Sequence, residues 1–396
     1  MKILVLTAFD LFPPVHGASS LVYTFVKRAS GRHEIAAVIS HLYSQGGKPD
    51  LPPDRVRIQY APPSAVDRLK VLSFWVNPAY YDTAVRTCQQ AHSELVQCET
   101  LWPFLAAWRL RRRHGVPLVW VEHNVEADKF AFLGRPRPLV ALVRQVERFA
   151  CRHADHVITL TEADRARLIS HYGLPDQRSS TITPGPDLSE FTFRLEDRDA
   201  VRAVYELMPD DALLTFVGNL RYEPNREAVR HIADRIYPAV VARHPAARFV
   251  IIGQGADRCS DYRRERLTFT GYVSRAQLVA HLCATDVFLV PVVTGAGVRV
   301  KIPEAAACGR AIVATRKALE GLEAYADDEI LRTDRVDDTF IGIVLRLIED
   351  RAWRHDVGER ARVRTLREFD WDKTLAAYEH AYAQAMNAAK HRFGAV

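Results

Sequence analysis

The 396-residue sequence has no apolar run of the ~18–20 residues that a membrane-spanning helix needs. Its apolar start, Met1 to Thr7, is interrupted too soon for a signal peptide and instead predicts a buried first strand. Low-complexity stretches are also lacking, and hydrophobic residues make up 48% of the chain against 26% charged residues. These proportions exclude a disordered chain and supply apolar side chains for more than one core.

Cysteine is scarce and follows no ligand pattern. None of the six cysteines forms a CxxC pair, and no His/Cys group has the spacing of a zinc site. Free cysteines in apolar surroundings pack as small core residues. We therefore expect a reduced, cytoplasmic protein without a structural metal.

Charge of one sign is only slightly in excess. Lys and Arg number 54 and Asp and Glu 48, which gives a net charge of +6. A mild basic balance suits an anionic ligand such as a nucleoside diphosphate, an anionic membrane surface or nucleic acid. Six charges in a chain of this length do not choose among these partners.

What the sequence does have is a regular alternation of strand and helix patterns, which occurs twice. It predicts parallel sheets covered by helices on both faces, hence an α/β fold of two Rossmann-like domains. We expect the domains over residues 1–185 and 200–370, joined by the Pro-, Gly- and charge-rich stretch 184–199. Asp372 is expected to cap a final helix, 371–396, that packs back on the first domain. The predicted strands are 2–7, 34–40, 118–122, 156–161, 181–183, 213–217, 248–252, 267–270, 287–292 and 311–315.

The stretch from Thr294 to Gly321 is the most informative part of the chain. Gly295 and Gly297 allow a sharp turn and a close approach to a ligand. Arg299 and Lys301 place two cations in the same short loop. The loop leads into a helix expected to start near Pro303, whose first N–H groups and dipole favour an anion.

Glu304 falls in the first turn of that expected helix. A carboxylate there can accept hydrogen bonds from two vicinal hydroxyls, as on a ribose. Taken alone, Glu304 is as well explained as a helix cap, and the two cations as solvated side chains. The coincidence of glycines, cations, helix start and carboxylate favours a nucleoside diphosphate site.

This stretch resembles the donor-binding motif of glycosyltransferase family 4. In that family two glutamates, separated by seven residues, precede a helix of small residues, a glycine and a strand. The second part is matched here by Glu304 to Gly309 and the following strand. The first glutamate is replaced by Ala296. The resemblance implies that Glu304 holds the ribose of the nucleotide.

Two further segments of the second half resemble the same family. In the segment around Gly218, the basic residue that meets the diphosphate would be Arg221. Many members carry a lysine a few residues later, where this chain has Asn225, so that the second cation would be Lys301. A solvated salt bridge is the alternative reading for Arg221. The resemblance further implies that backbone groups near Val273 pair with the base.

The first half contributes two residues by resemblance. His123, after the expected strand 118–122, matches a histidine that touches the donor sugar in family members. A structural role explains a lone histidine equally well. Gly17 matches a glycine loop that faces the cleft from the acceptor side.

The resemblance implies a GT-B fold, with two Rossmann-like domains facing across a cleft. It implies a retaining glycosyltransferase that needs no metal and no cofactor beyond a nucleotide-sugar co-substrate, by default a UDP-sugar. The acceptor would be a polysaccharide, a lipid-linked glycan or a small metabolite. A sugar-nucleotide epimerase and a non-catalytic nucleotide-sugar-binding protein are the alternatives. We expect no nucleic-acid partner.

Other signals are weaker. Asp197-Arg198-Asp199 has the form of a DxD metal motif, but it precedes a helix, where acidic residues are favoured by the dipole alone. The basic run from Arg109 to Arg113 lies at an expected helix end, where cations are favoured for the same reason. The sharper reading of this run is weak peripheral contact with the inner face of a membrane.

Overall fold

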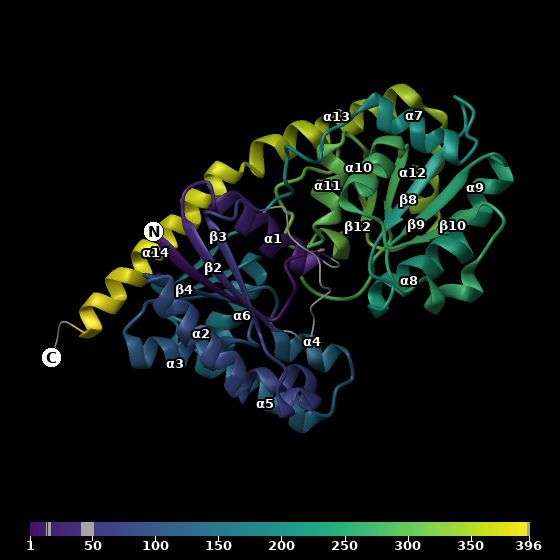
Figure 1. Cartoon of the computed structure of the whole chain (residues 1–396). Helices are drawn as coiled ribbons and strands as arrows, with labels where there is room; N and C mark the ends of the chain where they lie inside the picture. Colours follow the sequence, from purple (N-terminus) through teal and green to yellow (C-terminus); the bar gives the residue numbers. More distant parts are fainter. Residues whose placement is uncertain (13, 15–16, 41–50, 394–396) are drawn as a thin grey trace. The chain divides into compact units, whose positions relative to one another are not determined.

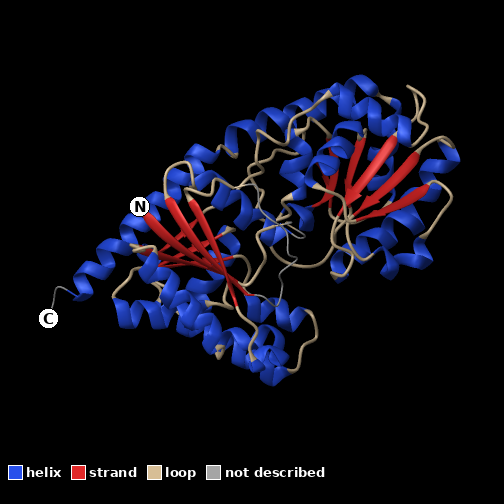
Figure 2. Ribbon diagram, viewed as in Figure 1, coloured by secondary structure: helices blue, strands red, loops and turns tan. Residues whose placement is uncertain are grey.

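The computed structural model describes residues 1–12, 14, 17–40 and 51–393, and these form two compact units (Figure 1). The first unit contains most of residues 1–184 together with the last helix, from Trp371. The second unit contains Gly185–Asp370. Both are parallel sheets flanked by helices (Figure 2), as the alternating sequence pattern predicts.

The sheet of the first unit has seven parallel strands in the order β3-β2-β1-β4-β5-β6-β7. Its central strands are almost wholly buried, which explains their continuous apolar runs. The strand bounds are β1 (Lys2–Thr7), β2 (Glu34–Ser40), β3 (Val56–Ala61), β4 (Leu95–Glu99), β5 (Leu118–Glu122), β6 (His156–Thr159) and β7 (Ser179–Thr181). The last of these precedes the predicted strand 181–183 by two residues.

Helices cover this sheet, and α2 packs on β1 to β3 while α3 packs on β4 and β5. Helix α3 ends at His114, where Gly115 adopts a left-handed conformation with φ of 69°. The bounds are α1 (Gly17–Ala29), α2 (Pro78–Gln90), α3 (Phe104–His114), α4 (Glu126–Phe132), α5 (Arg137–His153) and α6 (Glu162–Tyr172), with a 3-10 helix over Ala65–Trp75 and a shorter one, η3 (Asp176–Arg178).

The last helix, α14 (Trp371–Phe393), is part of the first unit and packs against β5 and β6. The ring of Tyr378 on α14 lies 4.8 Å from that of Phe25. Asp372 accepts a hydrogen bond from Arg32 at 2.6 Å. The helix begins at Trp371, so Asp372 lies in its first turn instead of capping it.

The sheet of the second unit has six parallel strands in the order β10-β9-β8-β11-β12-β13. The strand bounds are β8 (Leu213–Val217), β9 (Arg248–Ile252), β10 (Leu267–Gly271), β11 (Val287–Val290), β12 (Ala311–Thr315) and β13 (Leu331–Thr333). The helices are α7 (Leu195–Val204), α8 (Glu223–His231), α9 (Tyr237–Arg243), α10 (Arg275–Ala284), α11 (Lys301–Ala307), α12 (Asp338–Glu349) and α13 (Arg351–Glu368), with 3-10 helices over Ala256–Tyr262 and Arg316–Leu319.

Two helical segments of this unit differ from the sequence prediction. The sequence pattern predicts one long helix that opens at Pro224 and runs to about His244. In the structure a π-helical turn, η4 (Ile232–Ile236), divides this segment and separates α8 from α9. The stretch 184–199, predicted as a linker, belongs to the second unit from Gly185 onward, and α7 begins within it.

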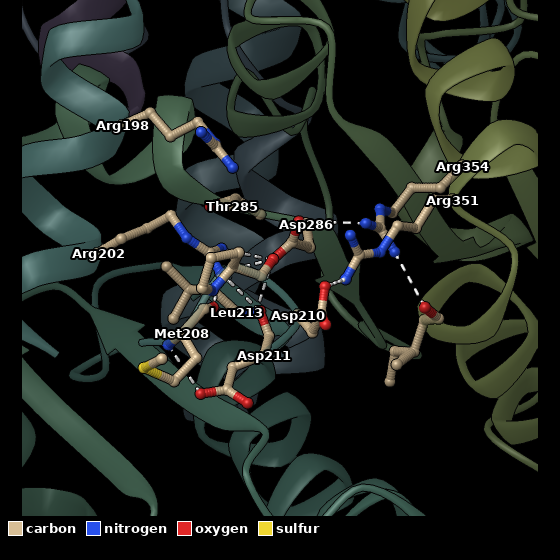
Figure 3. A network of polar contacts seen from close by, with 12 residues as sticks. Arg198, Arg202, Met208, Asp210, Asp211, Leu213, Thr285, Asp286, Arg351 and Arg354 are labelled. Atoms are coloured by element: carbon tan, nitrogen blue, oxygen red, sulfur yellow. Dashed lines mark hydrogen bonds and ion pairs between the residues drawn. The ribbon is translucent and has the colours of Figure 1, made fainter. Parts of the chain in front are cut away.

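A network of charges lies where β8 and β11 begin (Figure 3). Asp286 accepts hydrogen bonds from the backbone N–H of Leu213 at 2.9 Å and from Arg202 at 3.1 Å. Its other oxygen lies 3.4 Å from a guanidinium nitrogen of Arg354 on α13. Arg202 also donates to the carbonyls of Met208 and Asp211. This network ties α7, α13 and two strands together at the amino ends of the sheet.

In both sheets the strand order reverses beside the first strand of the unit. The reversal falls between β1 and β4 in the first sheet and between β8 and β11 in the second. In open parallel sheets, ligands bind outside the carboxyl ends of the strands at such a point. Among the described helices, none combines the length and apolar character that crossing a membrane requires.

Candidate functional site

The second unit presents its site at the carboxyl ends of β8 and β11, on either side of the strand reversal. The loop after β8 carries Gly218 and Arg221, and the loop after β11 carries Gly295 to Arg299. The sequence-predicted phosphate-binding segments therefore meet at the edge where this fold binds ligands.

Glycines are required where the loop after β8 meets its neighbours. A Cβ on Gly218 would lie 2.8 Å from Cγ of Asn225. A Cβ on Gly253, whose φ is 140°, would lie 2.0 Å from the carbonyl oxygen of Gly218. Leu220 donates a backbone hydrogen bond to the carbonyl of Gln254 at 2.7 Å. The loops that follow β8 and β9 are thus in backbone contact, and this contact fixes the conformation of the turn after β8.

The loop after β11 folds onto the start of α8. Gly295 and Gly297 have φ values of 91° and 86°, in the region that favours glycine. A Cβ on Gly295 would lie 2.8 Å from the hydroxyl of Tyr222. Thr294 donates its hydroxyl proton to Glu227 at 2.6 Å. The predicted sharp turn is therefore present and is held against α8.

Lys301 is a half-buried cation at the start of α11. Its ammonium donates to Oδ1 of Asn225 at 3.1 Å and lies 4.3 Å from the ring centre of Phe216. Burial, followed by the positive charge of Arg299, lowers the pKa of Lys301 to about 7, against a smaller raising effect of Glu304. The amine is thus held where an added anion would favour its charged form.

Glu304 is buried, with 7% of its surface exposed. Its carboxylate makes no hydrogen bond or ion pair with any residue that the structure describes. Burial raises the pKa of Glu304 to about 7, although Arg275 and Lys301 act to lower it. Buried carboxylates are ordinarily paired, so this one is available to a ligand that donates hydrogen bonds.

Two features of α11 differ from the sequence expectation. The helix begins at Lys301, two residues before Pro303. The N–H groups of Ile302 and Glu304 already donate to the carbonyls of Arg299 and Val300, at 2.9 and 3.1 Å, and proline has no N–H. The positive potential at the start of α11 therefore comes mainly from side chains and less from free backbone N–H groups.

Arg299 is turned back onto its own loop. It donates to the carbonyls of Gly297 and Thr294 at 2.6 and 3.2 Å, and it is 8% exposed. Its charge still acts on Lys301. Arg299 therefore shapes the glycine turn and contributes charge from within it.

Arg221 and Val273 lie on the loops that follow β8 and β10, two strands separated by β9 in the same sheet. Arg221 is exposed, and its guanidinium makes no hydrogen bond or ion pair with the described residues. Its backbone N–H is anchored by Asn219 at 3.0 Å. Val273 follows β10, next to Ser274, which caps α10.

The first unit places His123 after β5, two residues beyond Val121, which pairs with Glu99 of β4. The imidazole is 5% exposed, and its Nε2 lies 2.7 Å from Oε2 of Glu99. Gly17 is the first residue of α1. Sequence reasoning missed Glu99, because nothing in the sequence places β4 beside β5.

Sequence reasoning also missed the ion pair of Glu190 and Arg275 in the second unit. Both charges act on Glu304, Arg275 lowering its pKa and Glu190 raising it. The two residues are 85 positions apart and carry no motif. Within the described chain, no three His, Cys, Asp or Glu side chains gather closely enough to hold a metal ion.

Comparison with known families gives two matches that together span most of the chain. Residues 15–190 match a family model described as Glycosyltransferase Family 4. Residues 211–350 match one described as Glycosyl transferases group 1.

Curated relatives include the D-inositol 3-phosphate glycosyltransferase of Mycolicibacterium smegmatis, 31% identical over 71% of this chain and 64% of the relative. The protein of the same name from Mycobacterium bovis is 30% identical over 72% of this chain and 61% of the relative. The aligned region thus spans less than two thirds of the length of either relative.

Solved structures share the fold over nearly the whole chain. Sucrose-phosphate synthase of Thermosynechococcus elongatus has a TM-score of 0.81 at 19% identity, over 98% of this chain and 99% of that chain. Anabaena HepE in complex with UDP and glucose has a TM-score of 0.74 at 16% identity, over 97% and 99% of the two chains.

Proposed function

We propose that this chain, which belongs to glycosyltransferase family 4 and has the GT-B fold, transfers a sugar from a nucleoside diphosphate sugar to an acceptor hydroxyl with retention of configuration. The observation that carries the proposal concerns two groups at the carboxyl ends of the strands of the second sheet. The buried carboxylate of Glu304 has no hydrogen-bond partner among the described residues, and it lies within electrostatic reach of the cation Lys301.

The proposal gives each residue of the site a role. Glu304 accepts hydrogen bonds from the ribose hydroxyls, and backbone groups near Val273 meet the base. When the bond between the sugar and the diphosphate breaks, negative charge grows on the departing diphosphate. Lys301 and Arg221 stabilise that charge, with Arg299 holding the loop, and no metal ion is needed.

His123 and Gly17 supply the sugar and acceptor contacts in this proposal. His123 contacts the transferred sugar, and the acceptor enters on the side of Gly17. Uridine is the proposed base, because the Anabaena neighbours carry UDP, UDP with glucose, or UDP-glucose. D-inositol 3-phosphate belongs among the acceptors to be tested, since the curated relatives are named for it.

The test is incubation with a panel of UDP-, GDP- and ADP-sugars, with and without acceptors. A transferase releases nucleotide faster when its acceptor is present, and NMR of the product reports the anomeric configuration. Rearrangement of the sugar without an acceptor would identify an epimerase, and binding without turnover a non-catalytic protein. Full activity in EDTA is expected, and activity that returns only with Mg²⁺ or Mn²⁺ would contradict the cationic site.

A further inference from the structure

A chain of buried polar groups runs from α14 to His123 within the first unit. The hydroxyl of Tyr382 donates to Oε1 of Gln97. The amide of Gln97 donates to Oε1 of Glu99 at 2.5 Å, and Oε2 of Glu99 meets Nε2 of His123 at 2.7 Å. All four side chains are buried.

The strand geometry explains why these groups meet. Gln97 and Glu99 are two residues apart on β4, so that their side chains lie on the same face of the sheet. Strand β5 is paired with β4, and α14 packs on β5. Residues 285 positions apart are thereby joined through one buried strand.

The direction of each hydrogen bond follows from the carboxylate. An ionised glutamate only accepts hydrogen bonds, so Gln97 must turn its amide nitrogen toward Glu99. The carbonyl of Gln97 is then left to accept the proton of Tyr382. The ring nitrogen that faces Glu99 must also donate, which places a proton on Nε2 of His123.

The other ring nitrogen of His123, Nδ1, is buried and has no hydrogen-bond partner among the described residues. The nitrogen that carries the proton in a neutral imidazole is set by the hydrogen bond that the other nitrogen makes. With the proton held on Nε2, Nδ1 is the acceptor, able to receive a hydrogen bond from a hydroxyl.

We propose that Glu99, supported by Gln97 and Tyr382, is a positioning residue that holds His123 in the Nε2–H form, so that Nδ1 accepts a hydroxyl of the transferred sugar. The proposal rests on the proposed function for its ligand. It gives the C-terminal helix, through Tyr382, a part in orienting a sugar-binding residue of the first unit.

The direct test is the Glu99→Gln variant, which keeps the shape of the side chain and offers an N–H. In ligand-free protein labelled with ¹⁵N-histidine, His123 is assigned from the spectrum of His123→Ala. The wild type should show a protonated Nε2 and an unprotonated Nδ1, and Glu99→Gln should shift the proton toward Nδ1. Identical His123 nitrogen shifts in the variant and the wild type would overturn the proposal.

Glu122 provides the matched control. It is also a buried glutamate at the end of a central strand, but neither of its oxygens has a hydrogen-bond partner among the described residues. Glu122→Gln should leave the nitrogen shifts of His123 unchanged. Burial raises the pKa of Glu122 well above its usual range, so this control changes a buried carboxyl group without breaking a contact to His123. A change as large as that of Glu99→Gln would mean that any substitution of a buried glutamate near this strand end moves the histidine, and the specific contact would be refuted.

Kinetics separate positioning from folding. Glu99→Gln should lower kcat/KM for the nucleotide sugar about 10–100-fold, the range seen when the partner that orients a metal-binding histidine is removed. The Kd of the bare nucleoside diphosphate should stay unchanged, because that ligand lacks the sugar. Altered nitrogen shifts together with wild-type kcat/KM would contradict the role in sugar binding.

Tyr382→Phe tests the far end of the chain should Glu99→Gln not fold. It should lower kcat/KM a few-fold at constant nucleotide Kd, whereas Tyr378→Phe, on the same helix and outside the hydrogen-bonded chain, should not. Equal effects of the two variants would show that packing of α14 alone is responsible. A wild-type protein that transfers no sugar contradicts the proposed function instead, since the nitrogen shifts are measured without ligand.

Discussion

The second sheet carries a group of charged side chains at each of its two ends, and the two groups differ in how fully their charges are paired. At the amino ends, Asp286 is bonded by Arg202 and by the N–H of Leu213 and lies against Arg354. At the carboxyl ends, the described residues give Lys301 one hydrogen-bond partner, the amide oxygen of Asn225, and give the carboxylate of Glu304 none.

The group at the carboxyl ends also has strongly shifted pKa values. Burial moves the pKa of both Lys301 and Glu304 to about 7, so each is held in a site that disfavours its charge. Strongly perturbed groups of this kind gather at functional sites. Acidic and basic side chains thus stabilise the fold where they are paired, and in the proposed function the unpaired ones bind the ligand.

The largest effect is expected from breaking the paired group. Asp286→Ala leaves Arg202 and Arg354 without their common carboxylate and removes the acceptor of the Leu213 N–H. Removing one partner of a buried ion pair costs ~3–5 kcal/mol. Because 17% of the Asp286 side chain is exposed, we expect a loss near the lower end of that range, measured by urea unfolding. The Kd of the nucleotide should be unchanged in the folded fraction, and a variant as stable as the wild type would show that the network contributes little.

Lys301→Ala tests the unpaired group by its effect on turnover. Because charge develops on the diphosphate only as the bond breaks, the loss should fall on kcat more than on KM. We expect ~2–4 kcal/mol, the scale of one preorganised donor. Arg299→Ala is the informative partner, since it should also release the glycine loop, measured as faster proteolysis there. A wild-type kcat in Lys301→Ala would mean that this amine does not meet the diphosphate.

Removing a charge should change the free energy of unfolding in opposite directions at the two ends of the sheet: Asp286→Ala lowers it, whereas Glu304→Gln raises it. The folded-state pKa of Glu304 lies above its unfolded value, so the folded protein binds extra protons between about pH 4.5 and 7 and loses stability as pH rises through that range. Glu304→Gln should therefore raise the free energy of unfolding by ~1–3 kcal/mol at pH 8 and change it little at pH 4.5. Destabilisation at pH 8 would show that the carboxylate is structurally paired.

The same variant should weaken nucleotide binding while it stabilises the fold. Calorimetry with a nucleoside diphosphate and its 2′,3′-dideoxy form isolates the ribose contact. The wild type should prefer the ribose by about tenfold, or ~1.4 kcal/mol, and the variant should not. An unchanged preference would assign Glu304 to the start of its helix.

The sequence predicted the fold where strands are buried and apolar, as in β1, β2 and β8. It predicted little over residues 45–100, where β3 is an edge strand with several exposed positions and β4 ends in Gln97, Cys98 and Glu99. The glycine loop, Lys301 and Glu304 were found because they lie within eleven residues of one another along the chain.

Contacts between segments that are far apart along the chain could not be predicted from the sequence. Arg275 and Glu190 influence Glu304, and Glu99 meets His123, only because of the order of strands and helices in space. The inward turn of Arg299 depends on carbonyls that the positive φ values of Gly295 and Gly297 expose, and residue types alone do not specify it.

The smallest expected effect concerns protons exchanged when the nucleotide binds. A bound diphosphate favours the charged form of Lys301, so binding should take up part of a proton near pH 7. Ribose hydroxyls that donate to Glu304 favour its carboxylate and should release part of a proton in the same range.

The two contributions nearly cancel in the wild type, so affinity should vary by less than about threefold between pH 6 and 8, or ~0.7 kcal/mol. Each variant uncovers one of them. Glu304→Gln should bind with net uptake and weaken as pH rises, while Lys301→Met should bind with net release and strengthen. Calorimetry in buffers of different ionisation enthalpy measures the proton count directly. Uptake that persists in Lys301→Met would place the responsive group elsewhere.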